Sequence, residues 1–490
     1  MTFQIDDITW NDLSMDQVCE KINTAKSSVG QEYLVRTLKT LLLEEKELSG
    51  RAERVSCVGR DTELAARLQK IYKDLGKTKK ISLYDYIFRF HEIKPAGNAL
   101  HYVLGILLLA AILLVFLRPV IGIIALVVMF VINISVYFKY KAAIEGYFMC
   151  FKYIVRMIQA ASRILKTDLE KKEPFQELVE GLRSDVKELA PIRRGSWLLT
   201  NSVSGSLVDV VMDYVRMLFH VDIIRFNSMR KLAAEKSRTI DHLFCSLGEI
   251  ETDMCISSFR DTLDHWCLPV FCKRKDHPSL KITGMYHPLT PAVVTNDLSV
   301  DRSVLLTGSN ASGKSTFLKQ LAINQILAQT ISTCLADEYE TAFCKVMSSM
   351  ALADNILNGE SYFIVEIRSL KRIFDEIGKE EKIPVMCFID EVLRGTNTKE
   401  RIAASSQILK QISGMNALCF AATHDIELTR ILEGCMDNYH FEEYVEGNDV
   451  RFDYKLKEGP AKTRNAIRLM KAYGFDPSIT DAAEQLAGEL

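Results

Sequence analysis

Two uninterrupted apolar stretches lie in the first third of the chain. Residues 100–117 and 120–138 contain no charged side chain, and only Arg118 and Pro119 separate them. At a rise of about 1.5 Å per residue, each helix would be about 27 to 29 Å long, close to the thickness of a bilayer's hydrocarbon layer. Core helices of a soluble domain are the alternative, but such helices normally keep a polar stripe. Because proline suits a first helical turn, the pattern predicts a transmembrane helical hairpin over residues 100–138.

Basic residues flank the predicted hairpin on both sides. Two precede it and three follow it: Arg89, Lys94, Lys139, Lys141 and Lys152. Since Lys and Arg favour the cytoplasmic side, we expect two membrane-spanning helices in the cell membrane, with both soluble parts in the cytoplasm. The first 30 residues contain no apolar stretch typical of a secretory signal peptide, so none is expected.

The stretches on either side of the hairpin have a different pattern. Residues 12–90 and 139–265 are rich in Leu, Glu, Lys and Arg, and apolar residues recur at helical spacing, as over residues 33–42. These stretches are predicted to be mostly helical.

Composition narrows the possible functions. The 490 residues include 61 Lys and Arg against 63 Asp and Glu, a net charge of −2, so no positive excess argues for nucleic-acid binding. The 12 cysteines form no CxxC pair and have no nearby Cys or His set for a tetrahedral site. Neither zinc nor a disulfide framework is therefore expected.

The pattern changes near residue 300. A short apolar strand is predicted over residues 303–307, followed by the loop GSNASGKS over 308–315 and an apolar-periodic helix over about 316–330. Strand, GxxxxGK(S/T) loop and helix together predict a phosphate-binding loop, in which Lys314 reaches the β- and γ-phosphates and Ser315 ligates Mg²⁺. The candidate nucleotide-binding residues are Gly308, Ser309, Asn310, Ala311, Ser312, Gly313, Lys314, Ser315 and Thr316.

Two later strands carry further candidates at their ends. The apolar strand over residues 385–389 is followed by Asp390, placed to hold Mg²⁺, and Glu391, placed to orient and deprotonate the attacking water. A buried strand over residues 417–423 ends at His424, which we expect to contact the γ-phosphate or the water. A satisfied structural histidine is the alternative for His424.

These segments resemble the MutS family, whose ATPase domain belongs to the ABC class. The resemblance rests on GSNASGKSTFLKQLA from Gly308, DEVLRGTNTKER from Asp390, AATHDIEL from Ala421 and a signature-like segment, GESYFIVE, from Gly359. It implies a homodimer with two composite ATP sites, in which Ser361 of one subunit approaches the γ-phosphate bound by the other.

The resemblance extends outward, with departures. His287-Pro288-Leu289, residues 456–475 and, more weakly, residues 8–42 are similar to further family segments. Ala311 and Ser312 stand where the family usually has two glycines. Since the chain begins at what resembles the lever domain, the resemblance implies a membrane-anchored variant without the mismatch-recognition domain. Because the ATPase region extends nearly to Leu490, no C-terminal nuclease domain is expected.

The predicted fold is an α/β ABC-type P-loop ATPase domain preceded by a mostly α-helical lever-like region, which the hairpin interrupts. The domains expected are residues 1–99 and 139–279 for the helical region, 100–138 for the hairpin and 280–490 for the ATPase domain. The expected function is Mg²⁺-dependent ATP hydrolysis that switches the helical arms, with DNA contact left open.

Two other functions remain as alternatives. One is an ATP-gated DNA tether or clamp at the membrane. The other is an ABC transporter component, which the absence of an LSGGQ-type signature and the small number of helices disfavour.

Overall fold

The computed structural model describes most of the chain, in two compact units. The described residues are 1–78, 97–195, 214–272, 278–290, 294–309, 312–350, 362–379, 382–394, 396–446, 449–461, 467, 470–471 and 474–489. The α/β unit comprises Met1–Asn23, Val35–Glu53 and Ser258–Leu490, and the helical unit comprises Thr24–Leu34 and Arg54–Ser257. The predicted domain boundaries at residues 99, 138 and 279 stay a prediction.

A six-stranded sheet forms the core of the α/β unit. Its strand order is β14-β11-β6-β10-β9-β8, and neighbouring strands are parallel except β11 and β14. The strands are β6 (Ser303–Thr307), β8 (Lys345–Ser349), β9 (Val385–Asp390), β10 (Ala417–Ala422), β11 (Met436–His440) and β14 (Lys457–Glu458). Because β6, β10 and β9 are adjacent and parallel, their carboxyl ends meet at one edge, where ligands bind in open α/β sheets.

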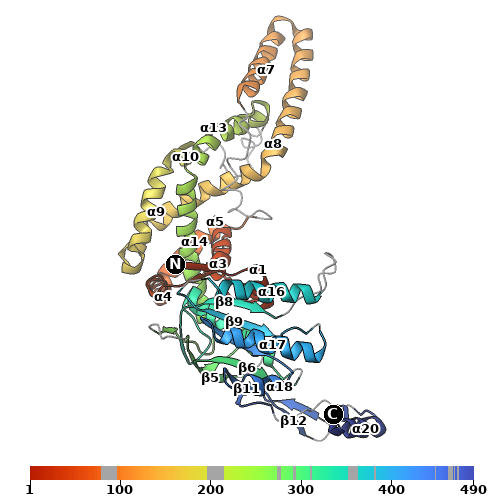
Figure 1. Ribbon diagram of the computed structural model, residues 1–490. Helices are drawn as coiled ribbons and strands as arrows, with labels where there is room; N and C mark the ends of the chain where they lie inside the picture. Colours follow the sequence, from red (N-terminus) through yellow and green to blue (C-terminus); the bar gives the residue numbers. More distant parts are fainter. Residues whose placement is uncertain are drawn as a thin grey trace. The chain divides into compact units, whose positions relative to one another are not determined.

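Helices cover both faces of this sheet (Figure 1). α15 (Lys314–Ile331) packs against β8, β9 and β10, while α16 (Tyr362–Ile377) and α17 (Thr398–Ser413) share a core cluster with Cys387 and Cys419. Since successive strand residues point to opposite faces, the neighbouring residues of these two cysteines line the α15 side. The three predicted strands at residues 303–307, 385–389 and 417–423 are thereby confirmed as central, buried strands.

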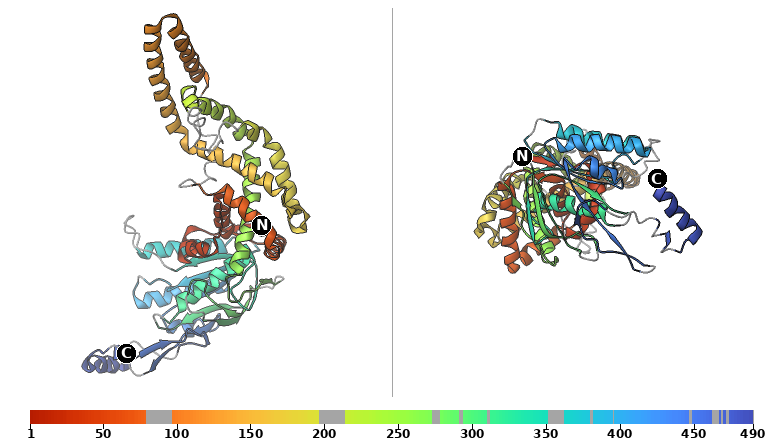
Figure 2. Two further views of the ribbon diagram at one scale, coloured as in Figure 1. Left: turned by 180° about the vertical axis from the view of Figure 1, so that it is seen from behind. Right: turned by 60° about the horizontal axis from the view of Figure 1, so that its bottom comes forward.

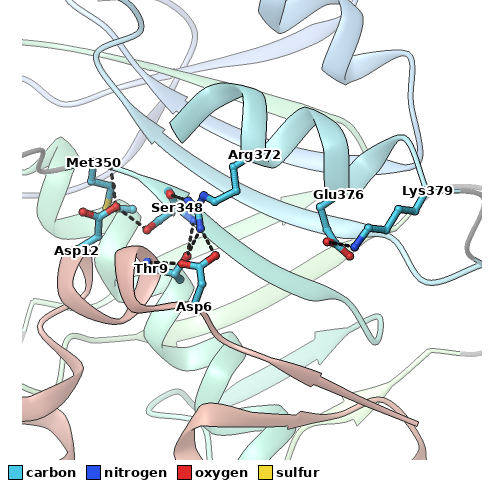
Figure 3. Close-up of polar contacts among 8 residues, drawn as sticks. All are labelled: Asp6, Thr9, Asp12, Ser348, Met350, Arg372, Glu376 and Lys379. Carbon is cyan, nitrogen blue, oxygen red and sulfur yellow. Dashed lines mark hydrogen bonds and ion pairs between the residues drawn. The ribbon is translucent and has the colours of Figure 1, made fainter. Parts of the chain in front are cut away.

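The N-terminal residues are part of this unit. α1 (Asp7–Asp12) packs against β8, and Figure 3 shows the polar contacts that hold it there. The Asp12 carboxylate accepts hydrogen bonds from Ser348 Oγ at 2.7 Å and from the Met350 N–H at 2.9 Å. Arg372 of α16 donates to the Ser348 carbonyl and to Asp6. The helical periodicity of the sequence does not predict long-range polar contacts of this kind.

Smaller elements complete the α/β unit. A four-stranded sheet has the order β3-β7-β4-β5, and two further strand pairs are β1 with β2 and β12 with β13. These elements are β1 (Thr2–Gln4), α2 (Met15–Ile22), β2 (Thr40–Leu42), β3 (Val270–Phe271), β4 (Leu280–Met285), β5 (Asn296–Val300), β7 (Glu338–Thr341), α18 (Glu427–Ile431), β12 (Glu443–Glu446), β13 (Asp449–Phe452) and α20 (Pro477–Glu489).

The helical unit contains helices throughout its described part, as predicted. They are α5 (Thr62–Leu75), α7 (Ala99–Leu117), α8 (Pro119–Ile164), the 3-10 turns Asp168–Lys171 and Glu173–Phe175, α9 (Gln176–Glu188), α10 (Ala190–Gly195) and α13 (Val221–Glu235). Three helices lie partly in each unit: α3 (Ser28–Lys39), α4 (Glu45–Arg60) and α14 (Ser237–Arg260). The buried core of the unit draws on α5, α8, α9, α13 and α14.

α7 and the first half of α8 form the predicted helical hairpin (Figures 1 and 2). Both helices are long and apolar enough to cross a membrane, by length and composition. Only 22% of the window in α7 and 17% of that in α8 is buried among the described residues, unlike a core helix. The turn is tight: a Cβ at Gly122 would lie 2.3 Å from the Val115 nitrogen. α8 continues well past the predicted end at residue 138, because its second half supplies buried apolar residues to the core of the helical unit.

Candidate functional site

A cavity of about 490 Å³ opens where β6, β9 and β10 end. Side chains from the phosphate-binding loop, from the end of β9 and from the segment after β10 line it together. Among the lining residues are Ser309, Ser312, Gly313, Lys314, Ser315, Thr316, Asp390, Glu391 and His424. The structure therefore brings the two halves of the predicted site together, although about 75 residues of sequence separate them.

The glycines of the loop are required by its backbone. Gly308 and Gly313 have φ of 145° and 108°, in the region that favours glycine. A Cβ at Gly308 would also lie 2.8 Å from the Phe441 carbonyl oxygen. The helix that follows begins at Lys314, two residues earlier than predicted, and its first residues, Lys314–Thr316, line the cavity. Asn310, Ala311 and Ser361 lie outside the described residues.

Lys314 is held at the mouth of the loop. Its side chain is buried, and Nζ donates to the carbonyl oxygens of Gly308 at 2.8 Å and Ser309 at 2.7 Å. Burial lowers the pKa of Lys314 to about 8, and the carboxylates of Asp390 and Glu391 act in the opposite direction. An anion in the cavity would favour the charged ammonium.

Ser315 and Asp390 place two oxygen atoms that could act as metal ligands side by side. Ser315 Oγ donates to Asp390 Oδ2 at 2.5 Å, and burial raises the pKa of Asp390 against the effect of this hydrogen bond. A hydroxyl and a carboxylate are ligands that Mg²⁺ prefers. Two buried hydroxyls of the loop, Ser309 Oγ and Ser312 Oγ, lack a hydrogen-bond partner among the described residues. The residues present therefore fit a magnesium-bound phosphate.

The side chains of His424 and Arg394 each contact one carboxylate oxygen of Glu391. His424 Nε2 lies 2.8 Å from Glu391 Oε1, and Arg394 Nε lies 2.9 Å from Glu391 Oε2. The hydrogen bond from His424 lowers the pKa of Glu391, with the charge of Arg394 adding to the effect and burial opposing it. Glu391 is thus an ionised carboxylate, which can accept a hydrogen bond from water.

The backbone after β9 is strained. Glu391 and Leu393 have φ of 56° and 58°, a region that non-glycine residues rarely occupy. Glu366 of α16 stabilises this turn, since its carboxylate accepts from the Arg394 N–H at 3.2 Å. Burial raises the pKa of Glu366, and the backbone hydrogen bonds from Arg394 and Leu393 oppose the rise.

Sequence reasoning missed several residues near the site. Arg394, Arg401 and Asp425 all lie within the segments quoted for the family resemblance. Arg394 pairs with Glu391 only three residues away, whereas the Arg401–Asp425 pair joins α17 to the segment after β10. Glu366 lies in the signature-like segment, but its contact with the Arg394 N–H depends on tertiary packing that the sequence pattern does not predict.

The cavity is also lined by aromatic and apolar side chains, which include His287, Val294, Phe441 and Tyr454. Burial lowers the pKa of His287 to about 4, so this imidazole is neutral near pH 7. Flat apolar walls suit the stacking of a planar base.

Histidine, cysteine and carboxylate side chains are the usual protein ligands of transition metals. Within the part of the chain that the structure describes, no group of three or more such side chains could hold a metal ion. None of the 12 cysteines, all of which lie within the described residues, forms a disulfide bond.

A parallel sheet, a phosphate-binding loop at the end of one strand and paired carboxylates at the end of a neighbouring strand define the α/β unit as a P-loop nucleotide-binding domain. Residues 304–490 match the family model "MutS domain V". This part of the chain is therefore a MutS-like ATPase domain.

The chain is also similar to proteins described as DNA mismatch repair protein MutS. It is 28% identical to that of Listeria monocytogenes serotype 4a over 297 residues, 57% of this chain and 33% of the relative. The match to the protein of Halalkalibacterium halodurans is 25% over 358 residues, 70% of this chain and 38% of the relative. The identity to the protein of Streptococcus uberis is 32% over 190 residues, which are 38% of this chain and 22% of the relative. The chain thus spans between 22% and 38% of the length of these curated relatives.

Proposed function

We propose that this protein is a membrane-anchored MutS-like ATPase that binds and hydrolyses ATP with Mg²⁺ to switch its helical arms. One observation supports hydrolysis most directly. The buried Lys314, the Ser315–Asp390 pair and the Glu391–His424 pair line one cavity, which combines phosphate binding, a cation site and a water-orienting carboxylate.

In the proposed mechanism, the loop N–H groups and Lys314 bind the β- and γ-phosphates of ATP. Ser315 and Asp390 would hold Mg²⁺, which supplies charge neutralisation on the phosphate oxygens. Glu391 accepts a hydrogen bond from the attacking water and orients it toward the γ-phosphate. His424 and Arg394 keep that carboxylate ionised and in place. Each Glu391 oxygen has a second lone pair, so these contacts leave an acceptor for the water.

The proposal includes a homodimer with two composite ATP sites. MutS family proteins typically dimerise through their ATPase domains, and by that resemblance Ser361 would approach the γ-phosphate bound by the partner subunit. Mixing tests this assignment. Lys314→Ala and Ser361→Arg homodimers should each be inactive, whereas a freely exchanged mixture should recover roughly a quarter of wild-type activity if the two sites are independent. No recovery, with exchange verified by pulling down one tagged variant, would contradict the shared site.

The membrane anchor is proposed to be the hairpin of α7 and the first half of α8. Its support is the pair of apolar helices with mostly exposed surfaces, together with the basic flanks that favour a cytoplasmic location for both soluble parts. In a lipid bilayer, this exposed apolar surface would be covered.

A DNA tether or clamp is the second candidate function, because the relatives are described as DNA mismatch repair proteins. The net charge of −2 gives it no support. The ATPase rate in liposomes, with and without duplex, single-stranded and branched DNA, discriminates between the two functions. A salt-dependent affinity for DNA would favour the tether.

Two variants test the proposed hydrolysis. Lys314→Ala should weaken both ATP binding and hydrolysis, because it removes the phosphate-binding ammonium. Glu391→Gln should bind ATP normally and turn over roughly a hundredfold more slowly, or worse, because it removes the water-orienting carboxylate. Binding of a fluorescent ATP analogue and phosphate release measure the two effects. Equal loss of ATP binding in both variants would contradict the assigned roles.

A further inference from the structure

An ion pair that the proposed mechanism does not use lies directly beside His424. Arg401 Nε donates to Asp425 Oδ2 at 2.8 Å, and its Nη2 donates to Oδ1 at 2.6 Å. Both side chains are largely shielded from solvent, with 25% and 11% of their surfaces exposed. Parallel hydrogen bonds from a planar guanidinium to a carboxylate fix both distance and orientation.

The pair connects α17 to the segment that carries His424. Arg401 lies in the first turns of α17, whose N-cap is Asn397. Farther along the same helix, Ser405 Oγ donates to the carbonyl of Val392, the residue after Glu391. The N-terminal half of α17 therefore binds the chain next to both members of the Glu391–His424 pair.

Backbone contacts carry this restraint to His424. The Asp425 N–H donates to Thr423 Oγ1 at 3.0 Å, and the Thr423 N–H donates to the Leu306 carbonyl on β6 at 3.0 Å. The residues on both sides of His424 are thus fixed, one by β6 and the other by Arg401. His424 itself is 35% exposed, so packing alone restrains its ring weakly.

We propose that Arg401 and Asp425 are positioning residues for hydrolysis, which hold the His424 ring against the Glu391 carboxylate. This inference rests on the proposed function. Neither residue touches the nucleotide in this account; they act through His424. Loss of the pair would let the segment after β10 shift, and displacements of about 1 Å near a reacting group can cost up to a hundredfold in rate.

Arg401→Lys is the informative substitution, because lysine keeps the charge but lacks the planar fork. Its kcat should fall about tenfold, with KM and ATP affinity within about twofold of wild type. Asp425→Asn, which keeps the side-chain shape, is the second variant if Arg401→Lys folds poorly. Arg302→Lys is the matched control, since Arg302 pairs with Asp437 in the same unit at 3.3 Å but away from the cavity lining.

A double-mutant cycle separates positioning from general stabilisation. In a His424→Ala background, Arg401→Lys should change the single-turnover rate less than twofold, because the group it positions is gone. An unchanged kcat in the single variant, or the same tenfold loss in both backgrounds, would overturn the inference. Wild-type protein without Lys314-dependent hydrolysis would instead overturn the proposed function, and the inference with it.

Discussion

The most apolar helix of the α/β unit is α15, and the most apolar helices of the helical unit are those of the hairpin. α15 is buried in protein, whereas the hairpin helices are mostly exposed. α15 is buried at 15 of its 18 positions and packs against β8, β9 and β10 of the six-stranded sheet. The hairpin windows of α7 and α8 are only 22% and 17% buried. Both lack a clear polar stripe, so hydropathy around the helix does not by itself tell a core helix from a membrane helix.

The polar residues make the distinction. α15 contains amide side chains that are fully buried and hydrogen-bonded: Asn324 to the Tyr286 carbonyl, Gln325 to Ala342, and Gln329 to Cys344. A folded protein supplies such partners, whereas lipid does not. In the hairpin, Asn133 Nδ2 instead donates to a carbonyl of its own helix, Met129 O, at 2.8 Å.

Polar contacts between the hairpin and other elements do exist among the described residues, but they lie toward the ends away from the Arg118–Pro119 turn: His101 Nδ1 lies 2.9 Å from His220 Nδ1, and the Tyr137 hydroxyl donates to Asp222 at 2.8 Å. Buried polar contacts with other elements along much of a helix thus indicate a protein core, whereas their restriction to its ends is compatible with lipid.

The largest expected effect comes from placing a charge in each helix. Leu327 in α15 is fully buried, while Leu107 in α7 is 47% exposed. Leu327→Lys should cost about 5 kcal/mol or more of stability, enough to unfold the α/β unit, because an unpaired ammonium would be buried. Leu107→Lys should leave ATPase activity intact but cost about 3 kcal/mol of membrane insertion.

Thermal unfolding and membrane retention after a carbonate wash measure the two outcomes. If Leu107→Lys unfolded the α/β unit, or if Leu327→Lys were tolerated, the contrast between the helices would be wrong.

Removing a polar side chain should have a smaller effect, again only in α15. Gln329→Leu leaves the Cys344 N–H and C=O without their partner, at a cost of about 2 to 4 kcal/mol. The matched change Asn133→Leu should cost less than about 1 kcal/mol, because only a contact within its own helix is lost. Denaturant unfolding of the purified protein compares them. A larger loss for Asn133→Leu would show that the hairpin carries a polar contact as important as those in α15.

The smallest effect concerns the one buried cation of α15. The pKa of Lys314 is about 8, and bound phosphates should raise it. ATP affinity is therefore expected to be constant below pH 8 and to weaken as pH rises through 8, by about tenfold between pH 7 and pH 9. Titration with a fluorescent ATP analogue at both pH values measures the change. Lys314→Arg, whose charge persists, should show a flat profile if it binds, and an equally steep one would exclude Lys314 as the titrating group.

Much of the site follows from sequence because its parts are local. The strand, the loop and Lys314–Ser315 form one continuous motif, and Asp390, Glu391 and His424 each end an apolar strand. The Arg401–Asp425 and Glu366–Arg394 contacts could not be predicted, since they join segments whose proximity depends on strand order. Likewise, the sequence pattern assigns Asp12 to a helical arm, although its carboxylate accepts a hydrogen bond from Ser348 on β8. The apolar hairpin was predictable from its length, but the continuation of α8 to Ile164 depends on packing within the helical unit.

Flotation with liposomes, combined with an ATPase assay, tests the central claim that a MutS-like ATPase is anchored through the hairpin. Wild-type protein should float with the vesicles after a carbonate wash and hydrolyse ATP in a Lys314-dependent manner. A variant with residues 100–138 replaced by a short flexible linker should hydrolyse ATP but remain in the soluble fraction. A deletion variant that still floats, or a wild-type protein that does not, would contradict the account.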